Sequence, residues 1–198
     1  MKHFILGIHG YLGSGKSTAG RFFEKKGALY IDADRVVENL YIVGNEGYRQ
    51  VRNYFGEEFF TVKGELNRKK LAKFVFTDPK KLKILHYLIH PLVTNEVQKL
   101  LDASTACLVV LEATYFEEKE LLKFVNRMLW IDAERGVVVE RLKEQKGYDE
   151  KRFAQILEAQ RRFLLKHKNN DTIENNDSLA DFEKQLENLW ENLQEFIV

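Results

Sequence analysis

Three glycines, a lysine and three serine or threonine residues fall within ten consecutive residues, HGYLGSGKST at positions 9–18. Gly10, Gly15, Lys16 and Ser17 match the pattern G-x-x-x-x-G-K-[ST]. In this pattern the glycines let backbone N–H groups turn toward phosphate oxygens. The lysine reaches the β- and γ-phosphates, and the hydroxyl binds Mg²⁺. The stretch therefore predicts a cradle for a nucleoside triphosphate.

The residues on either side of the glycine loop suit this chemistry. The apolar run HFILGI precedes the loop and predicts a buried strand, and TAGRFFEKKG predicts a short helix that ends at Gly27. A helix that starts near Lys16 would turn the positive end of its dipole toward bound phosphate. The motif thus lies between a strand and a helix, as phosphate binding requires.

Two acids follow a second predicted strand, ALYIDAD. Asp32 and Asp34 alternate with Ala33, so both carboxylates share one face if the strand continues that far. One carboxylate could accept a proton from an acceptor hydroxyl, and the other could organise Mg²⁺ through water. A structural alternative stays open, because Asp34 before RVVENLY is also suited to cap the start of a helix.

The remaining elements complete an α/β pattern. ACLVVLEA, RMLWIDAE and DTIENN predict three further strands, with Cys107 as a small core residue of the first. Residues 135–165 read as a long charged helical stretch interrupted near Gly147. The closing helix has one apolar face, formed by Phe182, Leu186, Leu189, Trp190, Leu193 and Ile197. We expect a mostly parallel five-stranded sheet flanked by helices.

The helical pattern from about residue 35 to residue 101 is too long for a simple crossover between parallel strands. It includes TDPKKLKILHYLI, which begins with Asp78 as a cap and Pro79 at the first helical position. We therefore expect an inserted helical subdomain.

Composition and missing motifs narrow the function. The 198 residues carry a net charge of +1, which gives no general attraction to nucleic acid or to an anionic membrane. The sequence has no apolar run of about 18 residues and no signal-peptide pattern, so we expect a cytosolic protein. It lacks the N-K-x-D and D-x-x-G strings of a GTPase, and LVVLEA ends in a single acid, Glu112, unlike a mechanical ATPase. A small-molecule kinase remains the best interpretation.

An ordered series of short matches over nearly the whole chain resembles the dephospho-CoA kinase family. After the glycine loop come the Asp-Ala-Asp segment in GALYIDADRVVENLY, then FGEEFF, then the Asn-Arg and His-Pro elements of GELNRKKLAKFVFTDPKKLKILHYLIHPLV. ERL at residues 140–142 resembles the start of the family's lid. EAQ and NDTIENNDS resemble its C-terminal elements.

The resemblance implies transfer of the γ-phosphate of ATP, with Mg²⁺, to the ribose 3′-hydroxyl of dephospho-CoA, the last step of coenzyme A synthesis. It implies a single P-loop kinase domain over residues 1–198. The nucleotide core would comprise residues 1–35 and 102–198, the helical acceptor-binding subdomain residues 36–101, and the helical lid residues 140–163.

The same resemblance assigns roles to individual residues. Asp34 is the expected base toward the 3′-hydroxyl, with Asp32 in support, and Lys16 and Arg141 are expected to act on the transferred phosphoryl group. The residues expected to hold ATP are Gly13, Ser14, Gly15, Lys16, Ser17 and Thr18 at the phosphates and Asn175 at the adenine, with Ser17 as the metal ligand. The residues expected to bind the acceptor are Asp34, Arg68, His90, Pro91 and Glu112.

The chain departs from the family pattern at several positions. Tyr11 replaces the second glycine of the usual Gly-Gly start, and EATYFEE stands where the family has an acid followed by Pro-Leu-Leu. Gln145 and Ile156 occupy lid positions where arginines are expected. Lid arginines neutralise charge on the transferred phosphoryl group, and the arginines at positions 152, 161 and 162 could replace them. Two alternatives follow: a kinase for another small acceptor, such as a nucleoside monophosphate, and a nucleotide-binding regulator with weak catalysis.

Overall fold

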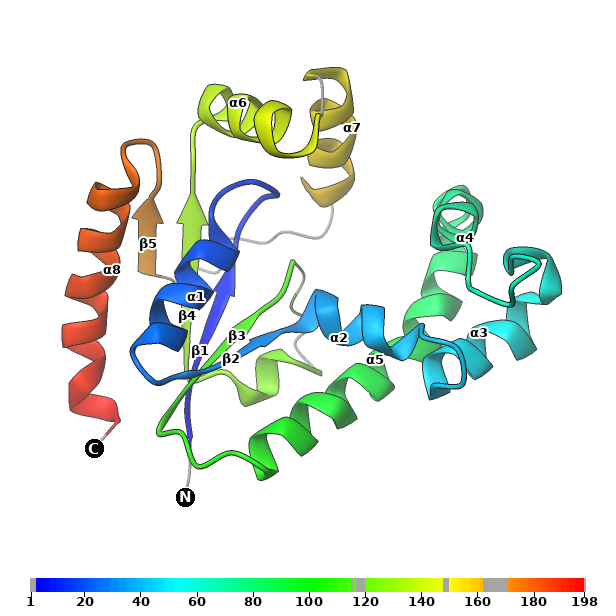
Figure 1. The fold of residues 1–198 in the computed structure, drawn as a ribbon, viewed down its shortest axis with the longest axis horizontal. Helices are drawn as coiled ribbons and strands as arrows, with labels where there is room; N and C mark the ends of the chain where they lie inside the picture. Colours follow the sequence, from blue (N-terminus) through cyan, green and yellow to red (C-terminus); the bar gives the residue numbers. More distant parts are fainter. Residues whose placement is uncertain (1–2, 115, 117–119, 148–149, 162–170, 198) are drawn as a thin grey trace. The chain divides into compact units, whose positions relative to one another are not determined.

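The computed structural model describes residues 3–197 except 115, 117–119, 148–149 and 162–170 (Figure 1). The chain divides into two compact units. Residues 1–32 and 104–198 form the first, called the core below, and residues 33–103 form the second, called the helical unit.

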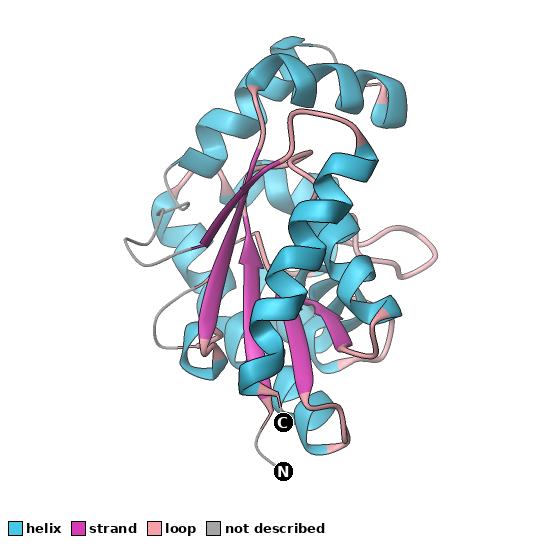
Figure 2. Cartoon of the chain, turned by 90° about the vertical axis from the view of Figure 1, so that its left-hand side faces the viewer, coloured by secondary structure: helices cyan, strands magenta, loops and turns pink. Residues whose placement is uncertain are grey.

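Five parallel strands form the sheet of the core. Their bounds are β1 (Phe4–His9), β2 (Leu29–Asp32), β3 (Leu108–Glu112), β4 (Arg127–Asp132) and β5 (Asp171–Glu174). They lie side by side in the order β2-β3-β1-β4-β5, and each of the four pairings is parallel. Figure 2 shows the strands in magenta with the helices around them in cyan. The sequence-based expectation of a mostly parallel five-stranded sheet is confirmed.

The helices of the core begin where the sequence indicated. They are α1 (Lys16–Lys25), α6 (Arg135–Lys146), α7 (Glu150–Arg161) and α8 (Leu179–Leu193), with short 3₁₀ turns η2 (Leu122–Phe124) and η3 (Gln194–Phe196). On one face of the sheet, Leu6 and Ile8 of β1 pack in one buried cluster with Phe23 of α1 and with Phe182 and Leu186 of α8. Alternate residues of a strand point to one face, which explains why Leu6 and Ile8 share this cluster. The predicted apolar face of α8 is therefore confirmed as core packing.

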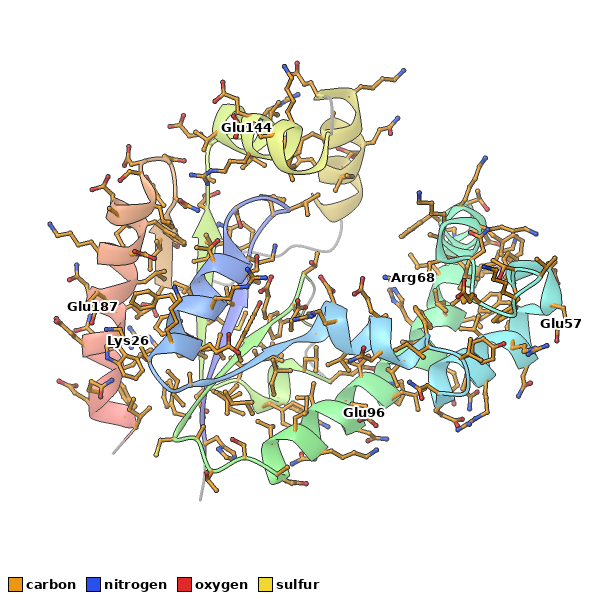
Figure 3. All side chains as sticks on the ribbon, in the orientation of Figure 1. Lys26, Glu57, Arg68, Glu96, Glu144 and Glu187 are labelled. Carbon is orange, nitrogen blue, oxygen red and sulfur yellow. The ribbon has the colours of Figure 1, made fainter. Side chains whose placement is uncertain are left out.

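Lys26, just after α1, and Glu187 of α8 form an ion pair of 2.6 Å over the same layer (Figure 3). Both side chains are more than a third exposed, so the pair adds at most about 1 kcal/mol to stability. The hydrophobic cluster, not this ion pair, fixes α8 to the core.

Cys107 corrects one prediction. Its side chain is exposed, because β3 begins only at Leu108 and the continuously buried run starts there. The backbone carbonyl of Cys107 still accepts a hydrogen bond of 2.8 Å from the N–H of Phe4. The residue therefore belongs to the entrance of the strand and not to the core.

The helical unit contains α2 (Ala33–Leu40), α3 (Glu46–Phe55), the 3₁₀ turn η1 (Glu57–Phe59), α4 (Arg68–Val75) and the long α5 (Pro79–Asp102). The start of α5 agrees with its sequence signals, because the Asp78 carboxylate accepts a 2.8 Å bond from the Lys80 N–H and Pro79 opens the helix. Helices α2, α3 and α4 each pack against α5. Among the described residues, no helix combines the length and the apolar character needed to cross a membrane.

Candidate active site

The glycine loop connects the end of β1 to the first turn of α1 in the core. Its backbone folds tightly, and the Ser14 N–H donates to the Tyr11 carbonyl at 3.2 Å. Gly13 has a φ of +80°, and a Cβ there would lie 2.8 Å from Cγ1 of Val138 on α6. A side chain at Gly13 would thus be strained and would collide with α6. Gly13 therefore lets the loop backbone pass close to α6.

Lys16, the first residue of α1, turns back over the loop. Its ammonium donates to the carbonyls of Gly10 and Tyr11, both at 3.0 Å, and its side chain is buried. Ser17 and Thr18 follow in the first turn of α1 and are exposed. The structure therefore brings the predicted nucleotide-binding residues 13–18 together at the amino end of one helix, where partial positive charge favours anions.

Tyr11, the bulky replacement in the glycine loop, packs against the sheet. Its ring makes an edge-to-face contact with Trp130 of β4, with ring centres 5.4 Å apart and planes at 88°. Trp130 makes a second edge contact with His9 at 4.7 Å. Aromatic pairs of this geometry contribute about 0.5–1.5 kcal/mol beyond their buried area. The Tyr11 side chain therefore attaches the loop to β4.

Asp32 and Glu112 are the last residues of two neighbouring strands, β2 and β3, and lie at the carboxyl end of the sheet. They lie opposite each other in the register. Glu112 is buried, and the hydroxyl of Tyr30 donates a short hydrogen bond to its carboxylate. Burial, followed by the hydrogen bond and charge of Glu112, raises the pKa of Tyr30 well above its ordinary value. Tyr30 thus remains a protonated donor to Glu112.

Asp34 corrects the sequence analysis. Strand β2 ends at Asp32, because its partner β3 ends at Glu112 and offers no further residue for pairing. The chain turns into α2 at Ala33, so Asp34 lies in the first turn of that helix. There the positive end of the helix dipole stabilises its carboxylate. Asp32 and Asp34 therefore do not share one face of a strand, and of the two alternatives the position at the start of a helix is the one observed. Asp34 is exposed and belongs to the helical unit.

A groove of about 710 Å³ in the helical unit contains three of the predicted acceptor-binding residues. Asp34 of α2, Arg68 of α4 and His90 of α5 all line it, and Arg68 is labelled in Figure 3. The other lining residues are Val37, Tyr41, Lys69, Leu71, Ala72, Val75, Phe76, Leu82, Leu85, His86 and Ile89. Pro91 lies within α5, is exposed and is not part of this lining.

The polar side chains of the groove carry mostly positive or titratable groups. Arg68 pairs with Glu38 at 3.0 Å, and both side chains are about half exposed. His86 stacks on His90 with ring centres 4.4 Å apart and planes at 22°. Burial raises the pKa of Tyr41 to about 12, against an opposing effect of Arg68. Sequence reasoning missed His86 and Tyr41; the i, i+4 spacing of His86 and His90 could have identified the first.

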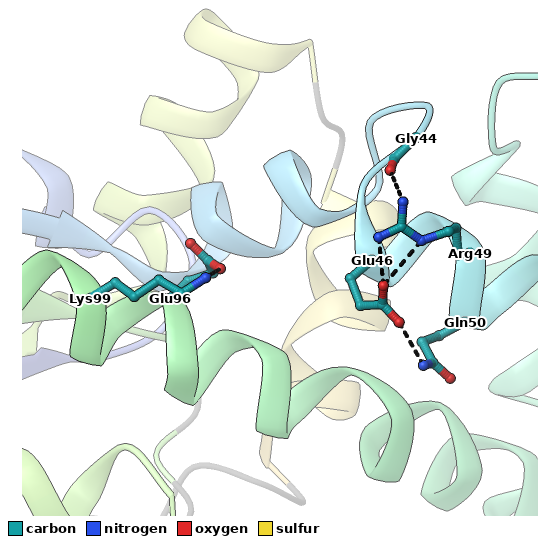
Figure 4. Close-up of polar contacts among 6 residues, drawn as sticks. All are labelled: Gly44, Glu46, Arg49, Gln50, Glu96 and Lys99. Atoms are coloured by element: carbon teal, nitrogen blue, oxygen red, sulfur yellow. Dashed lines mark hydrogen bonds and ion pairs between the residues drawn. The ribbon is translucent and has the colours of Figure 1, made fainter.

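A second hollow of about 330 Å³ in the helical unit has a different character. Its lining includes Asn45, Glu46, Arg49 and Glu96. As Figure 4 shows, the Arg49 guanidinium donates to the Glu46 carboxylate at 2.6 and 3.0 Å and to the Gly44 carbonyl at 2.5 Å. The positive charge of Arg49 is thus balanced by Glu46. None of the predicted site residues lines this hollow.

Asn175 and Arg141 lie beside the glycine loop in the core. The Asn175 amide donates to the Ser14 carbonyl at 2.8 Å, and Arg141 of α6 donates to Asn175 at 2.9 and 3.2 Å. Ile156 is partly buried on α7. The structure does not describe the side chains of residues 145, 152 and 161 or any part of residue 162, which are the other lid positions named above. The side chain of residue 160, the glutamine of EAQ, also lies outside the described part.

The all-parallel sheet, the glycine loop between β1 and α1 and the acids at the strand ends define a P-loop kinase. A family model described as dephospho-CoA kinase matches residues 4–181. The chain belongs to the dephospho-CoA kinase family.

Individual relatives agree with this assignment. The chain is 33% identical over 178 residues to a dephospho-CoA kinase of Idiomarina loihiensis, which covers 90% of this chain and 88% of the relative. Among solved structures, the Thermus thermophilus protein TT1252 is 27% identical, with a TM-score of 0.81 over 98% of this chain and 99% of that one. A dephospho-CoA kinase from Campylobacter jejuni shares the fold at 18% identity, with a TM-score of 0.63 over 96% and 97%.

Proposed function

We propose that this protein transfers the γ-phosphoryl group of ATP to the ribose 3′-hydroxyl of dephospho-CoA, forming coenzyme A and ADP. The observation that carries the proposal is the groove of the helical unit, in which Asp34 lies among Arg68, Lys69, His86 and His90. A carboxylate among cationic and titratable groups suits a hydroxyl acceptor that also carries phosphates.

The groove suits dephospho-CoA because this acceptor joins an adenosine to a long pantetheine arm through a diphosphate. Arg68 and Lys69 can bind the diphosphate, and a guanidinium can bind two of its oxygens at once. The apolar walls, which include Leu71, Val75 and Ile89, suit the adenine ring or the arm. Glu112 remains a proposed acceptor-binding residue at the edge of the core sheet.

In the proposed reaction the 3′-oxygen attacks the γ-phosphorus while Asp34 accepts the hydroxyl proton. The new P–O bond forms on the side opposite the leaving oxygen, and the bond between the γ-phosphorus and the β–γ bridging oxygen breaks to release ADP. Lys16 and Arg141 would neutralise the charge on the phosphates and on the transferred group. Asp32 would support the site, and residues 13–18 would hold the phosphates of ATP.

The oxygen ligands near the P-loop fit Mg²⁺. The Ser17 hydroxyl, and the Asp32 carboxylate acting through water, would supply the hard oxygen donors that this ion prefers. Within the described part of the chain, no cluster of three or more acidic, histidine or cysteine side chains could hold a metal alone. Mg²⁺ in kinases is usually held by few protein groups together with substrate phosphates. When bound, it would neutralise charge on the β- and γ-phosphates.

We expect the enzyme to act in the cytoplasm.

The proposal is tested by measuring ATP consumption with Mg²⁺ and a panel of acceptors: dephospho-CoA, AMP, CMP, shikimate and gluconate. We expect turnover with dephospho-CoA alone, and phosphorus NMR should show a new 3′-phosphomonoester. Faster turnover with a nucleoside monophosphate would identify a kinase for another acceptor. No turnover with any acceptor, combined with tight ATP binding, would indicate a regulator.

A further inference from the structure

Asn175 lies immediately after β5, and its backbone extends the pairing with β4. Its N–H donates to the Asp132 carbonyl at 2.8 Å, one residue beyond the last strand pair. The side chain is only 6% exposed. A buried amide needs partners for both its oxygen and its nitrogen, because an unsatisfied group costs about 1–3 kcal/mol.

The nitrogen of this amide reaches the P-loop. Nδ2 of Asn175 donates to the Ser14 carbonyl at 2.8 Å, between residues 161 positions apart in the sequence. The next residue, Gly15, has a φ of +106°, and a Cβ there would lie 2.2 Å from this same Nδ2. The second glycine of the motif is therefore needed for the approach of Asn175 as well as for the backbone conformation.

The oxygens of Asn175 accept hydrogen bonds from α6. Arg141 donates to the Asn175 carbonyl at 2.9 Å and to its Oδ1 at 3.2 Å. A bond from a guanidinium to Oδ1 is charge-assisted, and it polarises the amide so that Nδ2 becomes a stronger donor to Ser14. One side chain thus connects an arginine of α6 to the backbone of the P-loop.

We propose that Asn175 is a positioning residue that couples the P-loop to Arg141. The Asn175 amide fixes the position of Arg141 relative to the P-loop. The P-loop is expected to hold the ATP phosphates, and Arg141 is expected to lie at the transferred phosphoryl group. The catalytic part of this inference rests on the proposed phosphotransfer, but the coupling itself concerns ATP binding and can be measured without an acceptor.

The most selective variant is Asn175→Asp, with Asn176→Asp as its matched control. Asn175→Asp keeps the oxygen that faces Arg141 but places a second carboxylate oxygen against the Ser14 carbonyl. Asn176 lies in the same turn, and its Oδ1 accepts from the Glu134 N–H at 2.6 Å, a role that aspartate retains. By calorimetry we expect Asn175→Asp to weaken MgATP binding about tenfold and Asn176→Asp to change it less than twofold. Equal affinities for the two variants would overturn the proposal.

A double-mutant cycle separates coupling from a general loss of structure. Asn175→Ala, Arg141→Ala and the double variant are compared for MgATP affinity and for amide hydrogen exchange in residues 11–18. If Asn175 transmits the effect of Arg141, the double variant should bind MgATP within about twofold of Asn175→Ala. Additive losses, or faster exchange in Asn175→Ala that is spread evenly over the core, would contradict the coupling. An inactive wild-type protein would refute the proposed kinase function but leave both of these tests intact.

Discussion

The P-loop uses mainly backbone atoms and glycines, whereas the groove of the helical unit is lined by side chains from three separate helices. In the loop, the carbonyls of Gly10 and Tyr11 hold Lys16, and Gly13 fits where a side chain would collide. In the groove, Asp34, Arg68 and His90 come from α2, α4 and α5. Backbone geometry tolerates few substitutions, while lining side chains can change one at a time. We therefore propose that the loop binds ATP and that the groove selects the acceptor.

The largest effect is expected when the proposed base in the groove is removed, because this tests whether the groove and the P-loop have separate functions. Asp34→Asn should lower kcat with dephospho-CoA by about 10²–10⁴-fold, because the amide cannot accept the hydroxyl proton. The Kd for MgATP, measured by calorimetry, should remain unchanged because the P-loop residues lie in the core. Unchanged turnover in Asp34→Asn would remove Asp34 as the base.

The next largest effect concerns the positive charge of the groove. Arg68→Gln should raise the KM for dephospho-CoA about 10–100-fold, the loss expected for a charged hydrogen bond to phosphate, and leave the KM for ATP within twofold. Arg49→Gln is the matched control, because Arg49 pairs with Glu46 in the smaller hollow.

A double variant tests whether the loss in Arg68→Gln comes from Glu38, the ion partner of Arg68. Removing Arg68 leaves Glu38 without the ion partner it has at 3.0 Å, so Arg68→Gln combined with Glu38→Gln tests whether repulsion by Glu38 causes the loss. If Arg49→Gln raised the acceptor KM as much as Arg68→Gln, the larger groove would not be the acceptor site.

Tyr41 provides a stability measurement for the groove. Its pKa, raised to about 12 by burial, means that the folded state keeps the phenol proton where the unfolded chain, with a pKa near 10, has lost it. The contribution is therefore fully present below pH 10 and is lost as the pH rises toward 12, at a cost of about 3 kcal/mol. Urea unfolding at increasing pH should show a smaller alkaline loss of stability in Tyr41→Phe. Identical slopes for both proteins would mean that Tyr41 is not buried.

The smallest effect is expected for Tyr30→Phe. The phenol donates to Glu112, and the ring itself is retained in phenylalanine. Loss of one hydrogen bond to a charged group costs about 1.5–3 kcal/mol if its partner stays buried, and less if water replaces the phenol. Because Glu112 is a proposed acceptor-binding residue, we expect a three- to tenfold higher KM for dephospho-CoA and an unchanged Kd for MgATP. A higher Mg²⁺ requirement with an unchanged acceptor KM would place the function of Glu112 at the metal instead.

The two regions also differ in how well the sequence predicts them. The P-loop and its flanking strand and helix follow from one short segment, and the five strands and the α8 stripe follow from apolar periodicity. The end of β2 could not be predicted, because it depends on where β3 stops pairing, so the sequence alone left open whether Asp34 extends the strand or lies at the start of a helix. Tyr41 in the groove and the double role of the Asn175 amide depend on contacts between distant segments, which no local pattern contains.

The most direct test of the division is to measure the binding of each ligand alone to two variants, Lys16→Ala and Arg68→Gln, by calorimetry. Lys16→Ala should lose at least tenfold in MgATP affinity and bind dephospho-CoA as the wild type does. Arg68→Gln should show the reverse. If either variant weakened both ligands equally, or if Lys16→Ala affected only dephospho-CoA, the assignment of ATP to the P-loop and of the acceptor to the groove would be contradicted.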